Sequence, residues 1–270
     1  CRLSPFLTAI FSNSPLHLGK PSGYKSFRSR IWQNTDGTRS GIPGAFIRKD
    51  FTIEDYIDWA LLASPYHLNR QGEIHQLMDH SFRNLMDGSY PQIKTDFEDW
   101  KDHLGMLFPE IRIKNIIEIR SIDTLNPEYV LAVPALLQAL IYDETVFGKL
   151  ESMMMDLPEN EFPWYQQVAA RDGLAGQVNQ VNFSHFAKKL MEMALESLTL
   201  SEGCRLALFF DRYTRHGLSP ADLVLERYYS ADENPLKWIH KELQSDEEKQ
   251  SSFINFPCDF DEHPTSWVSN

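Results

Sequence analysis

The sequence predicts an α+β protein, with a few strands in its first half and an α-helical second half. Polar and apolar residues alternate in two stretches, Gly23–Trp32 and Ile111–Asp123, as in strands with one face on a core. Beyond them, apolar residues recur at helical spacing. We therefore expect the strands within about 23–123 and helices over 127–242, and strands this few indicate that the rest of their sheet lies upstream.

The stretch Ile111–Asp123 is the stronger strand prediction. On a single strand its side chains would alternate between an isoleucine-rich face and a charged face that carries Arg112, Glu118 and Arg120. A carboxylate between cations can hold a cation and an anion together, as a metal–phosphate ligand requires. The alternative is a solvated face with internal salt bridges.

Gly23–Trp32 is predicted to place Arg28 and Arg30 on one strand face. Arginine forks bind carboxylates and phosphates through two parallel hydrogen bonds, so these strand arginines suggest an anionic ligand. Alternatively, each arginine pairs with a nearby acidic residue. Residues 33–44 form a long loop rich in Gly, Asp, Asn and Thr that contains Arg39, and such loops often carry function.

Local capping and turn signals place the other elements of the first half. They predict an apolar helix end at 3–11, a helix at 52–63 capped by Thr52 with Asp55, a hairpin of 66–70 with 73–77, a short helix at 81–86 and a helix at 95–108 capped by Thr95 with Glu98.

Seven helices are predicted in the second half, at 127–143, 143–155, 160–171, 183–200, 201–216, 219–229 and 235–242. Asn182 or Ser184 and Ser219 are the expected caps, and Gly217 is the expected stop. The acidic, aperiodic residues 244–270 are predicted to form a flexible tail.

Composition excludes several classes of protein. The formal net charge of −12 and the pI of about 5.2 argue against nucleic acid or an acidic membrane as the main partner. No apolar run is long enough to predict a membrane-spanning segment. The three cysteines have neither metal-site spacing nor the spacing of a disulfide framework, so we expect a cytoplasmic protein.

Several motifs resemble those of a known enzyme family. They are FSNSP (11–15), GYKSFRSRIW (23–32), DYIDWAL (55–61), SFRNLMDG (81–88), DWKDHLGMLFPEIRIKNIIEIRSID (99–123), VPALLQALIYD (133–143) and SPADLVLERYY (219–229). In sequence and spacing they resemble the plant/proteobacterial type of glutamate–cysteine ligase, a carboxylate–amine ligase. The resemblance implies that 1–243 is the C-terminal part of one catalytic domain, with part of a glutamine-synthetase-like antiparallel sheet whose polar face forms the active site.

The resemblance also implies a chemistry. ATP would phosphorylate the γ-carboxylate of glutamate, and the amine of cysteine would then displace the phosphate, in the first step of glutathione biosynthesis. Glu118 would bind Mg²⁺ and Arg120 would contact the transferred phosphate or the glutamate. Arg28 would bind the glutamate carboxylate, and Tyr66, Arg39 and Arg30 would also bind substrate. The implied cofactors are ATP and Mg²⁺, and the oligomeric state is not predicted.

Departures from the family pattern leave other functions open. TLNPEYV (124–130) stands where the ligases carry two arginines, Arg30 stands where a histidine is common, and the Tyr66 segment reads SPYHLNR. One alternative is a related ligase with a different amine acceptor, and another is a non-catalytic ligase homologue. Since the family's paired metal-binding glutamates lie upstream, we expect these 270 residues alone to be inactive and to require an N-terminal part of the same chain.

Overall fold

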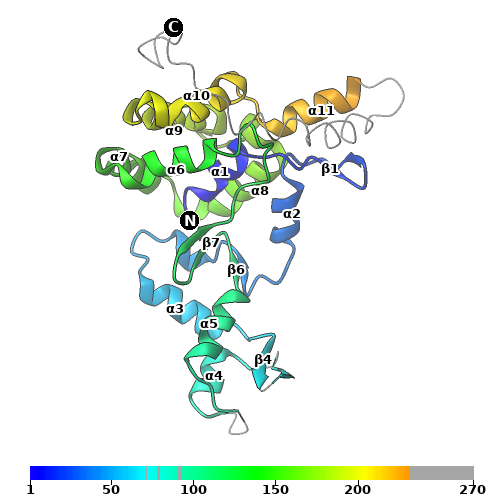
Figure 1. The fold of residues 1–270 in the computed structure, drawn as a ribbon, viewed down its shortest axis with the longest axis vertical. Coiled ribbons are helices and arrows are strands. Elements are labelled where there is room, and N and C mark those ends of the chain that lie inside the picture. Colours follow the sequence, from blue (N-terminus) through cyan, green and yellow to red (C-terminus); the bar gives the residue numbers. More distant parts are fainter. Residues whose placement is uncertain (71, 78–79, 90–92, 231–270) are drawn as a thin grey trace. The chain divides into compact units, whose positions relative to one another are not determined.

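The computed structural model describes residues 1–70, 72–77, 80–89 and 93–230. The predicted helix at 235–242 and the predicted tail at 244–270 lie outside these residues. The chain divides into two compact units (Figure 1). Unit 1 contains Cys1–Ser4 and Ile31–Ser121, and unit 2 contains Pro5–Arg30 and the chain from Ile122 onward.

The elements follow one another along the chain as labelled in Figure 1. The α-helices of the described residues are α1 (Ser4–Ile10), α2 (Phe27–Gln33), α3 (Ile53–Leu62), α4 (Phe82–Met86), α5 (Phe97–Gly105), α6 (Ala132–Tyr142), α7 (Glu144–Met155), α8 (Phe162–Asp172), α9 (Phe183–Ser197), α10 (Leu200–Arg212) and α11 (Pro220–Ser230). The strands are β1 (Leu16–His17), β2 (Lys20–Pro21), β3 (Ser40–Gly41), β4 (His67–Arg70), β5 (Glu73–Gln76), β6 (Phe108–Pro109), β7 (Ile111–Ile113), β8 (Ile117–Ile119), β9 (Gln177–Val178) and β10 (Val181–Asn182).

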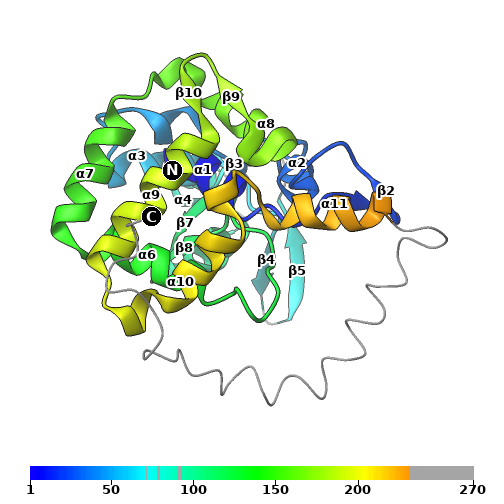
Figure 2. The same ribbon diagram turned by 90° about the horizontal axis from the view of Figure 1, so that it is seen from above.

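Unit 2 is built around the buried helix α1. Phe6 is fully buried and stacks on Phe186 with ring centroids 4.0 Å apart, and Phe183 and Tyr165 lie within 5.1 and 6.0 Å of it. Helices α6, α7, α9 and α10 pack on one another, and Figure 2 shows this group from above. Each of these helices buries one apolar face, and this periodic burial explains why the sequence reads as helix after helix here.

Unit 1 combines short helices with small strand pairs. Strands β4 and β5 form the predicted hairpin, seen in Figure 2, and Leu68 of this hairpin packs with Phe82 and Leu85 of α4. Strand β3 pairs in parallel with β6, so the loop that contains Arg39 is hydrogen-bonded to the segment that leads into β7.

Most of the helix ends that were predicted from local capping residues are confirmed. Thr52 and Asp55 form the capping box of α3, Asn182 caps α9, and Gly217 adopts the left-handed conformation with φ of 69°. The predicted cap of α5 is wrong by one residue. Asp96, not Thr95, accepts the first backbone N–H groups, and its capping box is completed by Asp99.

The strand predicted at Gly23–Trp32 is wrong. The chain folds there into a loop followed by α2, because Ser26 Oγ accepts the N–H of Ser29 at 3.1 Å and so caps the first turn. Arg28 and Arg30 are therefore two positions apart on a helix, where side chains point to different faces.

Ile111–Asp123 is not one strand but a β-hairpin. Strands β7 and β8 pair antiparallel, with Arg112 opposite Glu118, around a turn at 114–116. The turn places Asn115 where its short polar side chain is favoured. The isoleucine face of the hairpin is only partly buried, because Ile117 remains 68% exposed.

The α+β class is confirmed, with short strand pairs in place of an extended sheet among the described residues. None of the described helices combines the length and apolarity needed to cross a bilayer. Cys1 is free and partly buried.

We predict that buried His103 makes unit 1 sensitive to acid. Desolvation, helped by the charge of Arg39, lowers the pKa of His103 to about 4, although its bond to the Ala60 carbonyl at 2.7 Å opposes this. The unfolded chain binds a proton near pH 6.5 and the folded chain does not. The free energy of unfolding should therefore fall as pH drops from 6.5 to 4, by up to about 3 kcal/mol.

Urea unfolding over this pH range tests the prediction. His103→Gln should remove this part of the pH dependence, whereas His185→Gln, at an exposed position, should keep it. Identical pH profiles for the wild type and His103→Gln would contradict the prediction.

Candidate active site

Arg28 lies in the first turn of α2 in unit 2. Its backbone N–H donates to Ser14 Oγ at 3.1 Å, and its guanidinium Nη1 lies 3.8 Å from Asp123 Oδ1. The side chain is 30% exposed although its Nη1 is buried, so Arg28 is anchored at its base and partly exposed. This is a suitable arrangement for an arginine that binds an anion.

Asp123 is the acceptor around which this turn is organised. Its Oδ2 accepts the N–H of Asn13 at 2.8 Å and the hydroxyl of Ser14 at 2.7 Å. Its Oδ1 accepts the hydroxyl of Ser26 at 2.8 Å. The carboxylate side chain is only 2% exposed. A buried charge of this kind is retained where several donors satisfy it.

Arg30 occupies a different environment on α2. Its guanidinium lies over the ring of Tyr24, 5.5 Å from the centroid. Arg28 and Arg30 therefore do not share a face, and each has different neighbours. Substrate binding by Arg30 stays a prediction.

In unit 1, Glu118 pairs with two arginines. Arg112 contacts its carboxylate at 2.5 and 2.8 Å and is itself fixed by the carbonyls of Gly105 and Leu107. Arg120 lies 3.7 Å from the same carboxylate. Desolvation opposes the shift, but the Arg112 hydrogen bond and the neighbouring positive charges hold the pKa of Glu118 below its ordinary value. Glu118 is therefore a carboxylate that stays ionised.

Arg120 lies beside a pair of aromatic rings, Trp32 and Phe108, which stack on each other with centroids 5.4 Å apart. Its guanidinium lies 5.5 Å from the ring centroid of Trp32 and 5.6 Å from that of Phe108. Its backbone N–H donates to the Glu110 carbonyl at 2.8 Å. The aromatic pair and the backbone bond restrict the position of the cation.

The structure brings Arg39 and Tyr66 together in unit 1. Arg39 is 3% exposed and donates to Asp36 Oδ2 at 2.8 Å and to the Ser64 carbonyl at 2.7 Å. Its guanidinium lies 3.8 Å from the centre of the Tyr66 ring. Arg39 thus supports Tyr66, and substrate binding by either residue stays a prediction.

The described residues of unit 1 and unit 2 do not themselves form a metal centre. No group of three or more His, Cys, Asp or Glu side chains suitable for a metal ion occurs among them. Glu118 supplies one carboxylate, and Arg112 already occupies it. Metal binding by Glu118 stays a prediction.

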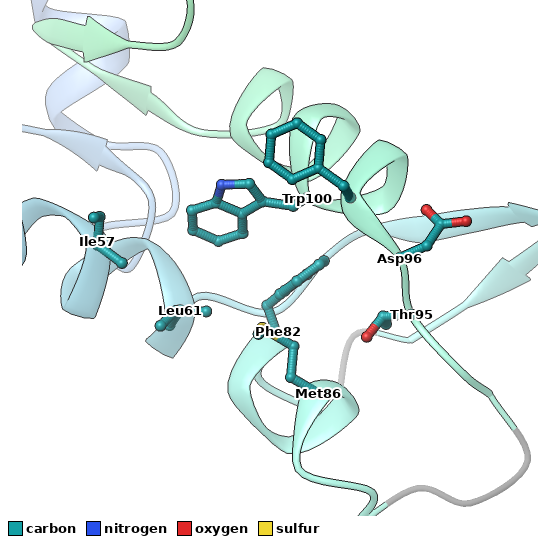
Figure 3. Close-up of a pocket in the computed structure, with 8 residues that line it drawn as sticks. Ile57, Leu61, Phe82, Met86, Thr95, Asp96 and Trp100 are labelled. Atoms are coloured by element: carbon teal, nitrogen blue, oxygen red, sulfur yellow. The ribbon is translucent and has the colours of Figure 1, made fainter.

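An apolar pocket of about 330 Å³ lies elsewhere in unit 1 (Figure 3). Its lining is formed by Ile57, Leu61, Phe82, Met86, Thr95, Asp96, Phe97 and Trp100. None of the predicted site residues is among them, and Asp96 is already engaged as the cap of α5. The pocket lacks the cations that a phosphorylated or carboxylate ligand requires.

Sequence reasoning missed one residue of this site. Asp123 was seen only as the end of a motif, because its partners lie 97 to 110 positions earlier in the chain. Arg112 and Glu118 do share a face as expected, but they do so as partners on the two strands of a hairpin and not on one strand.

We predict that Arg39 stabilises unit 1. Arg39→Lys keeps the charge but loses the forked donor and the flat contact with Tyr66, so it should lower the free energy of unfolding by about 2 kcal/mol. Arg48→Lys is the matched control, because Arg48 is 44% exposed and pairs at the surface with Asp50 and Asp55. Equal urea midpoints for the two variants would contradict the prediction.

Comparisons with known proteins identify the family. Residues 1–249 match the model of glutamate-cysteine ligase family 2. The chain is 32% identical over 233 residues to the chloroplastic glutamate–cysteine ligase of Nicotiana tabacum, covering 84% of this chain and 44% of that protein. For the Solanum lycopersicum enzyme the identity is 31% over 247 residues, covering 89% and 47%. For the Arabidopsis thaliana enzyme it is 30% over 232 residues, covering 84% and 44%.

The chain spans less than half the length of these three relatives. All three are named chloroplastic, which overturns the expectation of a cytoplasmic protein. The family match covers every residue that the structure describes, including each of the predicted site residues. The chain therefore belongs to glutamate-cysteine ligase family 2.

Proposed function

We propose that the protein containing this chain joins the γ-carboxylate of glutamate to the amine of cysteine at the expense of ATP, in glutathione synthesis. The observation that carries the proposal is the family match over residues 1–249. Because the relatives matched here are chloroplastic enzymes, we place the reaction in a plastid.

Arg28 is the proposed ligand of a glutamate carboxylate. The support for this role is the anchored base and partial exposure of the side chain, and its fork geometry matches a carboxylate. Holding glutamate by a group away from the reacting carboxylate would orient the substrate for phosphorylation.

Arg120 is the proposed cation for the transferred phosphate. Negative charge spreads over the phosphoryl oxygens during transfer, and an oriented guanidinium stabilises that charge. The support for this role is the proximity of the Trp32 and Phe108 rings, which lie within 5.6 Å of the cation and limit its movement. In the resulting acyl phosphate the carboxyl carbon is electrophilic. The cysteine amine would attack that carbon and release inorganic phosphate.

Mg²⁺ would supply charge neutralisation on the ATP phosphates, and we propose Glu118 as one of its ligands. The part of the chain that the structure describes offers no complete set of ligands, so we derive no step through the metal. Glu118 also holds Arg112 and Arg120, which links any change at this carboxylate to both cations.

We propose that Tyr66 contacts the amine substrate and that Arg39 acts through Tyr66. The support is the stacking of Arg39 on the tyrosine ring at 3.8 Å. Arg30, over Tyr24, is proposed as a weaker substrate contact.

A different amine acceptor is the second candidate function. It is favoured by 124–130, where the family's two arginines are replaced. In this chain Tyr129 fills that segment by packing edge-on against Phe209 and Tyr213, with ring centroids 6.0 and 5.2 Å apart. Burial raises the pKa of Tyr129 to about 12, so it remains neutral and cannot replace an arginine charge.

We predict that Arg28→Ala in the full-length protein loses activity through weaker glutamate binding. Removing a charged hydrogen bond to a carboxylate should lower kcat/KM for glutamate about 10- to 100-fold. ADP release measured with ATP, Mg²⁺ and glutamate, with and without cysteine, gives this ratio.

Arg171→Ala is the control, because Arg171 is exposed and forms an ion pair with its sequence neighbour Asp172. Cysteine-dependent ADP release that Arg28→Ala loses and Arg171→Ala keeps is the expected result. Release with another amine alone would support the second candidate. No release with any amine would favour the non-catalytic homologue.

A further inference from the structure

We infer that Asp123 is a positioning residue for Arg28 and thereby sets the affinity for glutamate. The inference rests on the proposed function, and it concerns a residue that the family resemblance did not assign to the site. Asp123 is buried in unit 2, where Ser14 links it to the backbone of Arg28 and its own carboxylate lies near the guanidinium.

The first link runs through the backbone. Ser14 Oγ donates to Asp123 Oδ2 at 2.7 Å and accepts the N–H of Arg28 at 3.1 Å. One hydroxyl therefore connects the carboxylate to the main chain of the arginine. The N–H of Phe27 also donates to the Ser14 carbonyl at 2.9 Å, so the start of α2 is tied to the same turn.

The second link runs through the helix cap. Ser26 Oγ donates to Asp123 Oδ1 at 2.8 Å and accepts the N–H of Ser29 at 3.1 Å. A serine hydroxyl has one proton to donate. Since Asp123 takes that proton, the oxygen lone pairs of Ser26 face the helix and cap it. The direction of α2, and with it the origin of the Arg28 side chain, follows from this bond.

The third link acts on the guanidinium. Asp123 Oδ1 lies 3.8 Å from Arg28 Nη1, which is close enough for attraction but longer than a hydrogen bond. The three shorter bonds described above engage the carboxylate. Asp123 thus draws the arginine toward one orientation by charge.

Unit 2 contains a matched carboxylate for comparison. Asp222 accepts the N–H and hydroxyl of Ser219 at 2.8 and 2.7 Å and the ammonium of Lys25 at 2.6 Å. Like Asp123, Asp222 accepts three hydrogen bonds, but its donors are Ser219 and Lys25 and not residues that hold Arg28. Asp222→Asn therefore controls for the general cost of altering a bonded carboxylate.

The test uses the full-length protein and measures kcat and KM for glutamate, ATP and cysteine. Asp123→Asn should raise KM for glutamate at least about 10-fold and change KM for ATP less than about 2-fold. Asp222→Asn should leave all three KM values within about 2-fold. The double variant Asp123→Asn/Arg28→Ala should be no worse than Arg28→Ala alone, because both changes remove the same interaction.

Circular dichroism and thermal melting establish that each variant is folded. If Asp123→Asn does not fold, Ser14→Ala replaces it, and the same selective rise in KM for glutamate is expected. A folded variant with unchanged KM for glutamate, or effects that multiply in the double variant, would overturn the inference. A wild-type protein that ligates glutamate to no amine would overturn the proposed function, and the inference with it.

Discussion

The buried carboxylate of Asp123 joins segments that lie far apart in the sequence. Its hydrogen bonds reach Ser14, 109 positions earlier, and Ser26, 97 positions earlier. Leaving these donors without an acceptor inside the protein would be costly, so the end of α1, the start of α2 and the chain after the β7–β8 hairpin must meet at one place. The position of Arg28, and hence the proposed recognition of glutamate, depends on this meeting point.

In unit 1, too, the candidate site arginines are held in place by neighbouring side chains. Glu118 holds Arg112 and Arg120, while aromatic rings support Arg120 and Tyr66 supports Arg39. These cations are thus oriented by groups that differ from the ligands they would bind. An arginine that is oriented before its ligand arrives loses less conformational entropy on binding, which favours tight recognition of anionic substrates.

The fold could be predicted wherever the deciding interaction is local. Thr52 and Asp55, or Asn182 and the N–H three residues on, lie within one turn of chain, and their patterns predicted α3 and α9. Alternation was a weaker guide. In Gly23–Trp32 it concealed the cap at Ser26, and in Ile111–Asp123 it concealed the turn around Asn115. A cap or turn of one residue changes the side on which every following side chain lies.

The candidate site could be predicted in part. Motif resemblance selected Arg28, Glu118 and Arg120, but it gave no indication of what holds them. Asp123 acts through contacts with residues 97 to 110 positions away, so no pattern within a short window contains both partners. Arg39 shows the opposite case, since the sequence placed it in an open loop and the structure buries it under Tyr66.

The most direct test of the proposed chemistry follows an oxygen atom. Glutamate labelled with ¹⁸O in its γ-carboxylate would be incubated with the full-length protein, ATP, Mg²⁺ and cysteine, and the inorganic phosphate analysed by mass spectrometry. If the carboxylate attacks ATP and the amine then displaces phosphate, one labelled oxygen passes into each phosphate released. Phosphate that carries no label while dipeptide forms would contradict the acyl-phosphate route.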